Sequence, residues 1–142
     1  MPTSWFITGA SSGLGRSLTE LVLSEGDAVT AAVRRPEGLR DLSGAHSGRL
    51  TVEELDVTSS QDVARVVARC LARGRVDVVV NNAGGGLVGA TEEMTDAEVQ
   101  HQIALNLLAP IQVTRAFHAA LKARLDRLES QEKIARSMTF AV

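Results

Sequence analysis

The sequence predicts an α/β protein in which a parallel sheet is covered by helices on both faces. Short apolar runs alternate with helical segments over the first hundred residues, and this alternation is typical of parallel strands joined by right-handed crossovers. Several runs are continuously apolar, as in strands buried on both sides. All 12 glycines lie at or before Gly89. The last part of the chain therefore lacks the commonest turn residue, and we expect it to end in long helices.

Four apolar runs predict the strands. In chain order they are residues 4–8, 28–33, 50–55 and 76–80. The second run contains only small and β-branched residues, and the fourth is valine apart from Asp77. The connection over residues 36–48 is rich in glycine and leaves room for at most a short helix. The second crossover is therefore expected to be reduced.

Two amphipathic helices are predicted between these strands. The first follows residue 8 and stops near Gly26; its apolar stripe is Leu14, Leu18, Leu21 and Val22. The second follows the third strand, with Thr58, Ser59 or Ser60 as its cap. Its stripe is Val63, Val66, Val67, Cys70 and Leu71, a pattern that buries one face of a helix.

The remainder of the chain has a helical pattern. Thr95 and Glu98 form a capping box at its start, and Pro110 marks a kink or a helix start. A later leucine stripe, Leu121, Leu125 and Leu128, predicts a long terminal helix. The chain is thus expected to be one domain over residues 1–142, with a β/α core at 1–94 and a helical part at 95–142.

Composition excludes several classes of function. The 142 residues carry a net charge of −2, which argues against a nucleic-acid partner. Cys70 is the only cysteine, so no disulfide within the chain and no cysteine-based metal cluster is expected, and the thiol is interpreted as buried and inert. No apolar run reaches the length of a membrane span and no leader pattern is present. We expect a cytoplasmic protein without a metal site.

A glycine-rich loop lies between the first strand and the first helix. It reads Gly9-Ala10-Ser11-Ser12-Gly13-Leu14-Gly15, at the position where an open α/β sheet binds phosphates. Gly9 would allow a sharp turn, Gly13 a close approach of backbone to a diphosphate, and Gly15 close packing of the helix. The first helical N–H groups would then receive the anion. This context predicts a Rossmann-type dinucleotide-binding fold, although the loop alone would also fit a simple tight turn.

Three motifs at successive strand ends resemble the short-chain dehydrogenase/reductase family. They are the glycine loop preceded by Thr8, Asp56-Val57 after the third strand, and Asn81-Asn82-Ala83-Gly84 after the fourth. The resemblance implies that Asp56 contacts adenine and that Asn81 to Gly84 brace the sheet beside the cofactor. It also implies that Asn106, in Ala-Leu-Asn-Leu-Leu, is an active-site asparagine that helps to hold a water in a proton relay.

Each of these residues also has a local interpretation. Asp56 fits a cap of the following turn, and Asn81 and Asn82 fit local bonding of loop backbone. Asn106 fits a solvated helix position. A methyltransferase or another mononucleotide-binding α/β protein would account for the glycine loop, but not for the Asn-Asn-Ala-Gly run.

The end of the second strand predicts the choice of cofactor. An acidic residue there would bind both ribose hydroxyls of NAD, whereas the sequence has Arg34 and Arg35. A guanidinium pairs well with phosphate. We expect Arg34, helped by Arg35 or Arg16, to favour NADP(H) over NAD(H). The candidate cofactor-binding residues are Gly9, Ser11, Ser12, Gly13, Leu14, Gly15, Arg34, Asp56, Val57, Asn82, Ala83 and Gly84, and the candidate catalytic residue is Asn106.

The family's catalytic Tyr-x-x-x-Lys pair is missing, because the chain contains no tyrosine. In the family, the tyrosine exchanges a proton with the substrate. Lys122 and Lys133 have no tyrosine four residues before them, and Ser130 and Ser137 lie in a charged helical context. Two functions stay open: an oxidoreductase acting on a carbonyl or alcohol, and a catalytically silent dinucleotide-binding module. A full member of the family would continue through further strands after Asn106, so the resemblance implies a sheet truncated after its fourth strand. Truncation, an internal deletion or a defective gene would each account for the pattern.

Self-association is expected as well. A shortened sheet leaves an unpaired edge strand, and the last helices expose apolar faces. Members of the family commonly pair through the helix that carries the match to Asn106. We therefore predict a homodimer or a higher homo-oligomer.

Overall fold

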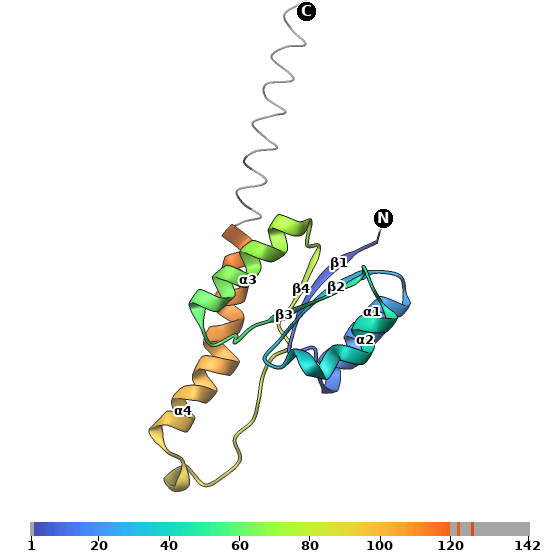
Figure 1. Cartoon of the computed structure of the whole chain (residues 1–142). Coiled ribbons are helices and arrows are strands. Elements are labelled where there is room, and N and C mark those ends of the chain that lie inside the picture. The colour runs from blue at the N-terminus through green and yellow to red at the C-terminus, as the bar shows by residue number, and fades with distance from the viewer. Residues whose placement is uncertain (1, 120–121, 123–125, 127–142) are drawn as a thin grey trace, which may run out of the picture.

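The computed structural model describes residues 2–119, 122 and 126. Within them, four parallel strands form one sheet in the order β3-β2-β1-β4 (Figure 1). The strands are β1 (Ser4–Thr8), β2 (Ala28–Val33), β3 (Leu50–Glu54) and β4 (Val78–Val80). The first two match the expected ranges, whereas β3 ends one residue early and β4 begins two residues late. Ahead of β4, Asp77 N–H donates to the Ser4 carbonyl at 2.8 Å, while the Asp77 carboxylate accepts from Ser4 N–H at 2.9 Å, so a side chain supplies the return bond of this pair.

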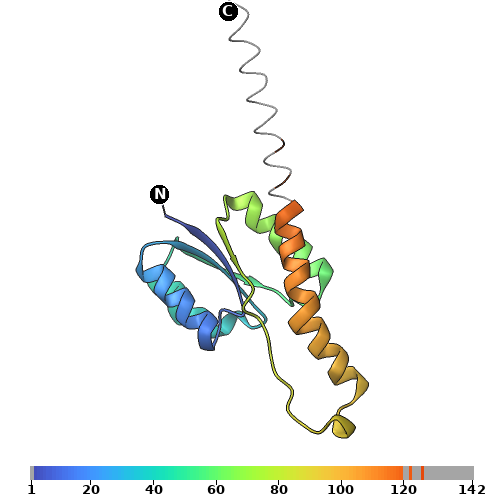
Figure 2. The same ribbon diagram turned by 180° about the vertical axis from the view of Figure 1, so that it is seen from behind.

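Helices cover both faces of the sheet, as predicted (Figures 1 and 2). On one face lie α1 (Gly13–Ser24), the 3₁₀ turn η1 (Pro36–Leu39) and the short α2 (Arg40–Ala45). On the other face lie α3 (Ser60–Arg73) and a helix that begins as α4 (Asp96–Ile103). The second crossover is reduced to η1 and α2, as expected from its glycine content.

Two apolar clusters fill the space between the sheet and its helices. Phe6 and Ile7 are neighbours on β1 and point to opposite faces, and both are fully buried. Phe6 packs edge-on against Phe117 with ring centroids 4.8 Å apart. Ile7 lies in the cluster with Leu23 and Leu39. Burial of each such side chain contributes about 1.5–3 kcal/mol, so both helical layers are anchored on the central strand.

The apolar stripe predicted for α1 is wrong at two positions. Leu14 is 84% exposed and Leu21 is 58% exposed. The buried positions of the helix are Gly15, Thr19, Val22 and Leu23. The Thr19 hydroxyl donates to the Gly15 carbonyl at 2.8 Å, which satisfies it inside the core. Close packing of the first turn against the glycine loop places small Gly15 and Thr19 on the inner face, and Leu14 and Leu21 are turned outward.

The prediction for α3 is confirmed. The Ser59 hydroxyl accepts a bond from Asp62 N–H at 3.2 Å and caps the helix. Val63, Val66 and Val67 are buried together with Cys70, and Leu71 packs against them.

The helix on the far face continues through Pro110. It begins with the predicted capping box of Thr95 and Glu98 and passes into a π-helical segment, η3 (Ala104–Leu108), where Ala109 N–H bonds to the Ala104 carbonyl. Residues 109–119 then follow as α-helix. Proline cannot donate to the carbonyl four residues earlier, and its ring crowds that carbonyl. The wider π turn relieves this conflict, so the helix is neither ended nor started at Pro110.

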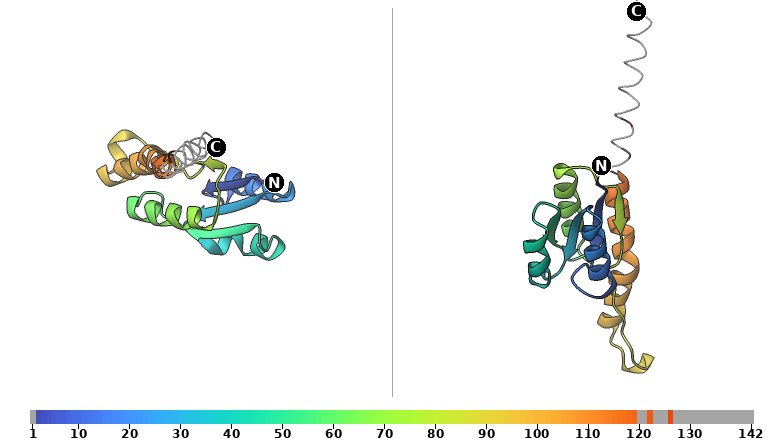
Figure 3. Two further views of the ribbon diagram at one scale, coloured as in Figure 1. Left: turned by 90° about the horizontal axis from the view of Figure 1, so that it is seen from above. Right: turned by 90° about the vertical axis from the view of Figure 1, so that its right-hand side faces the viewer.

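The connection between β4 and α4 extends beyond the carboxyl ends of the strands and contains the 3₁₀ turn η2 (Thr91–Glu93) (Figure 3). Within the described part of the chain, no helix is both long and apolar enough to cross a bilayer. The stripe predicted at Leu121, Leu125 and Leu128 lies outside the described residues, as do Ser130, Lys133 and Ser137.

Candidate functional site

The glycine loop turns sharply between β1 and α1. Gly9 has a φ of +67° and Gly13 a φ of +53°, in the left-handed region that favours glycine. A β-carbon at Gly9 would lie 2.8 Å from the Ala83 Cα, whereas one at Gly13 would meet no heavy atom within 4 Å. The loop is thus pressed against the segment after β4 at its beginning and open at the start of the helix.

Gly15 allows α1 to pack directly on this loop. A β-carbon at that position would overlap the Asn82 Nδ2 and the Gly9 carbonyl oxygen. Its own φ is not in the left-handed region, so the requirement for glycine comes from space alone. The first turn of α1 is held where its N–H groups face the carboxyl edge of the sheet.

Thr8 joins the ends of β1 and β4. Its hydroxyl donates to the Val80 carbonyl at 3.3 Å and accepts from the N–H groups of Asn82 and Ala83, each at 3.0 Å. The Asn82 amide donates to the carbonyls of Thr8 at 3.0 Å and Gly9 at 3.1 Å. These bonds fix the loop after β4 beside the glycine turn. They match the bracing role that the resemblance implied for this motif.

Asn106 fixes the same loop from the helix. Its Oδ1 accepts from Gly85 N–H at 3.1 Å. Its Nδ2 donates to the Gly85 carbonyl at 2.8 Å and to the Gln102 Oε1 at 2.9 Å. Asn81 makes a parallel contact, because its Nδ2 donates to the Thr114 Oγ1 at 3.1 Å. The segment after β4 is therefore tied to both the sheet and the helix.

A cavity of about 490 Å³ opens at this edge of the sheet. Nine of the predicted cofactor residues line it: Gly9, Ser11, Ser12, Leu14, Arg34, Val57, Asn82, Ala83 and Gly84. Gly13, Gly15 and Asp56 are not among its lining residues, and neither is Asn106. The exposure of Leu14 is explained by its position, since this residue lines the cavity and does not pack in the core.

Sequence reasoning missed part of the cavity wall. The missed lining residues are Ala32, Val33, Leu55 and Leu105. Leu55 was assigned to the third strand, and Leu105 precedes Asn106 on the helix. No local pattern indicates that these two leucines share a site, because only the packing of the helix on the sheet brings them to the same cavity.

Asp56 has a local role in the structure. Its Oδ1 accepts from the Thr58 N–H at 2.9 Å and from the Thr58 hydroxyl at 2.6 Å. These two bonds, with a smaller contribution from the charge of Arg34, hold the pKa of the carboxyl below its ordinary value. Asp56 lines a second cavity of about 420 Å³, which it shares with Arg34. Its local interpretation as a turn cap is thus realised, and its role toward adenine stays a prediction.

The three arginines proposed for cofactor choice differ in their surroundings. Arg34 and Arg35 line the main cavity, and neither guanidinium has a hydrogen-bond or ion-pair partner among the described residues. Arg16 donates instead to Glu20, to Asp41 and to the Gly38 carbonyl. It is not a lining residue of the cavity. Arg34 and Arg35 are therefore available to an anion in the cavity, while Arg16 is engaged elsewhere.

This geometry defines a class of protein. A parallel sheet whose first strand leads through a glycine turn into a helix start, beside a cavity at the carboxyl edge, is the arrangement of Rossmann-type dinucleotide-binding proteins. The family model for short chain dehydrogenases matches residues 4–127. The chain belongs to the short-chain dehydrogenase/reductase family.

Curated relatives support this assignment. Oxidoreductase BOA17 of Botryotinia fuckeliana is 37% identical over 118 residues, which cover 82% of this chain and 43% of the relative. Retinol dehydrogenase 5 of Mus musculus is 36% identical over 127 residues, covering 87% of this chain and 40% of the relative. The chain thus spans less than half the length of these relatives.

Solved structures agree with the fold. A short-chain dehydrogenase from Streptomyces avermitilis superposes with a TM-score of 0.83 at 42% identity, covering 87% of this chain and 46% of that one. A metagenomic short-chain oxidoreductase in complex with NADP gives a TM-score of 0.79 at 35% identity, covering 86% of this chain and 57% of that one.

The close packing at Gly15 predicts the effect of a single methyl group. Gly15→Ala should lower the free energy of unfolding by roughly 1–3 kcal/mol, because the new β-carbon has no room beside Asn82 and Gly9. Gly44→Ala is the matched control, since a β-carbon there meets no atom within 4 Å. Because Gly44 lies inside the helix α2, Gly44→Ala should leave the free energy of unfolding unchanged or raise it by up to about 1 kcal/mol. Urea unfolding measures both, and equal effects of the two substitutions would contradict the packing argument.

Proposed function

We propose that this chain binds NADP(H) in the main cavity, as the cofactor-binding part of a short-chain dehydrogenase/reductase-like oxidoreductase that acts on a carbonyl or alcohol. The observation that carries the proposal is the pair of unpartnered guanidinium groups, Arg34 and Arg35, at the end of β2. An acid at this point would favour NAD, because it binds both ribose hydroxyls. Arginine instead pairs with the 2′-phosphate that only NADP carries.

The lining of the cavity fits the remaining parts of this cofactor. The N–H groups at the start of α1, from Ser11 to Gly15, are the proposed diphosphate site, helped by the positive end of the helix dipole. The open space at Gly13 leaves room for it. Val57 and Asp56 are proposed for the adenine side, and Asn82 to Gly84 for the nicotinamide side. When bound, the nicotinamide would supply the hydride acceptor or donor.

Two structural neighbours support the choice of cofactor. The metagenomic oxidoreductase was solved with NADP, and an alcohol dehydrogenase from Thermococcus sibiricus, 30% identical with a TM-score of 0.79, was solved with 5-hydroxy-NADP. These ligands belong to those proteins, and we carry them over to this chain as part of the proposal.

Asn106 is the proposed water-holding residue of the family's proton relay. Both N–H groups of its side chain are already used by Gly85 and Gln102. Its backbone carbonyl lacks the usual donor four residues later, because Pro110 has no N–H. The carbonyl is therefore the group that we propose for the water.

Substitution of Arg34 tests the proposed cofactor site. Arg34→Gln should raise the NADPH dissociation constant about tenfold to hundredfold, since a hydrogen bond to a charged group contributes ~1.5–3 kcal/mol. The NADH constant should stay nearly unchanged. Arg75→Gln is the control with the same loss of charge, because Arg75 pairs with Asp77 just ahead of β4, away from the cavity. Fluorescence titration measures each constant, and a wild-type preference for NADH would refute the proposal.

A second candidate is a module that binds the dinucleotide without turning over substrate. It is favoured by one fact, the absence of tyrosine from all 142 residues, because the family's acid/base step uses a tyrosine hydroxyl. For this polypeptide alone we expect NADPH binding and no oxidation of NADPH with a panel of ketones and aldehydes. A full-length relative run beside it is the positive control. Turnover above the protein-free rate would favour the complete enzyme.

The helix of residues 96–119 is the proposed surface for a second copy of the chain. Val99, Ile103, Leu107 and Ile111 are each at least 38% exposed, and they follow one another at intervals of four. We expect light scattering at micromolar concentration to give the mass of two chains. Leu107→Arg should reduce it to one chain, whereas Leu21→Arg, on the opposite face of the sheet, should not. A wild-type mass of one chain would contradict the dimer.

A further inference from the structure

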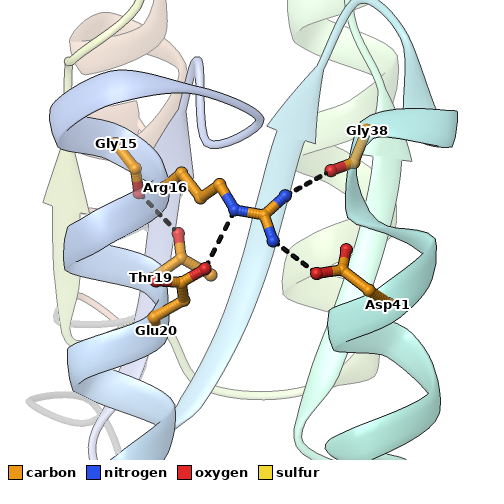
Figure 4. Close-up of polar contacts among 6 residues, drawn as sticks. All are labelled: Gly15, Arg16, Thr19, Glu20, Gly38 and Asp41. Atoms are coloured by element: carbon orange, nitrogen blue, oxygen red, sulfur yellow. Dashed lines mark hydrogen bonds and ion pairs between the residues drawn. The ribbon is translucent and has the colours of Figure 1, made fainter.

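Arg16 connects the first helix to the segment that follows β2. Its Nε donates to the Glu20 Oε1 at 2.9 Å, one turn along α1. Its Nη1 donates to the Gly38 carbonyl at 2.7 Å in η1, and its Nη2 pairs with the Asp41 carboxylate in α2 (Figure 4). One guanidinium thus ties α1 to both parts of the second crossover.

The electrostatics of this cluster argue against a direct phosphate contact by Arg16. Two carboxylates surround the single cation, so its charge is more than compensated within the cluster. The hydrogen bond from Arg16 is also the main reason why the pKa of Asp41 lies below its ordinary value. A phosphate that binds the Arg16 guanidinium would have to displace both carboxylates. A phosphate that binds Arg34 or Arg35 would displace no such partner.

The bonds of Arg16 reach the cavity arginines through backbone. Gly38 N–H donates to the Arg35 carbonyl at 3.3 Å, and Gly38 C=O accepts from Arg16. Arg35 is the residue directly before η1, and Arg34 precedes it. The path from α1 to the backbone of Arg35 therefore consists of two hydrogen bonds, both made by Gly38.

The same turn also touches the glycine loop. A β-carbon at Gly38 would lie 3.2 Å from the Ser11 Cβ, so η1 rests against the loop proposed for the diphosphate. Leu39 is fully buried in the core on this face, which anchors the turn from below. Arg16 adds the lateral constraint that the apolar contact, being non-directional, does not provide.

We infer that Arg16 is a positioning residue for cofactor selection: by holding η1 against α1, it fixes the distance between the diphosphate loop and the two arginines at the end of β2. This inference rests on the proposed NADP(H) site and deepens it. The spacing matters only for a ligand that reaches both ends, and a dinucleotide with a 2′-phosphate does so whereas NADH does not. Loss of the tie should therefore weaken NADPH binding selectively.

The test compares Arg16→Met with Glu20→Gln in the full 142-residue chain. Arg16→Met should raise the NADPH dissociation constant about fivefold to tenfold, the size of a moderate coupling between sites. NADH binding should change less than about twofold, and so should both constants in Glu20→Gln, because Glu20 contacts Arg16 without touching η1. Equal changes for NADPH and NADH, or no change for either, would overturn the inference.

Two further measurements separate this inference from the cofactor assignment. Asp41→Ala removes the anchor on α2 from outside the cavity and should reproduce the selective loss, with no added effect in the double variant. Hydrogen exchange of the backbone amides of residues 37–41, without any ligand, should be faster in Arg16→Met than in wild type. If wild-type protein shows no preference for NADPH, the proposed function fails. If the preference is present but exchange and selectivity are unchanged in Arg16→Met, only the role of Arg16 fails.

Discussion

The site depends on the hydrogen bonds between Thr8, at the end of β1, and the segment after β4. The two strands pair over only three residues, so the ladder alone defines little beyond Val80. Thr8 is 1% exposed, and an unsatisfied buried hydroxyl costs about 1–3 kcal/mol. Asn82 and Ala83 together satisfy the hydroxyl, and the Asn82 side chain also bonds the carbonyls of Thr8 and Gly9. This requirement sets the position of the loop against which the glycine turn packs.

Close approach of backbone follows from that arrangement. At three glycines an added β-carbon would come too close to a neighbour. The pairs are Gly9 with Ala83, Gly15 with Asn82, and Gly84 with Asn106. Because these three positions carry no side chain, the backbone of the glycine loop and that of the segment after β4 approach each other closely at the edge of the sheet. The same crowding decides which face of α1 turns inward, and it explains why the small Thr19 is buried while Leu14 is free to line the cavity.

Local signals predicted the strands, the caps and the motif loops, because each is encoded within a few residues. The capping box at Thr95 and the stripe of α3 are of this kind. The inner face of α1 could not be read in the same way, since contact with Asn82, far along the chain, overrides its hydrophobic pattern. The π segment before Pro110 escaped prediction because a proline pattern does not say whether the helix breaks or widens. The ties of Arg16 to Gly38 and Asp41 exist only after α1 and α2 pack side by side.

The distribution of partners among the arginines is the remaining constraint on function. Burial alone would raise the pKa of Glu53, but hydrogen bonds from Arg69 and Arg73 more than offset it and leave the pKa lowered. The Glu53 carboxylate is therefore paired with two arginines of α3. Asp56 accepts two hydrogen bonds from Thr58 within the turn. The charge of Arg34 also acts on the Asp56 carboxylate and contributes to its lowered pKa. Arg34 and Arg35 are exposed cations at the cavity, and neither guanidinium gives up a hydrogen bond or ion pair to another described residue when an anion binds. An arginine that must first break an ion pair binds phosphate more weakly, so the engagement of Asp56 by Thr58 is part of what makes this edge of the sheet suited to a phosphorylated ribose.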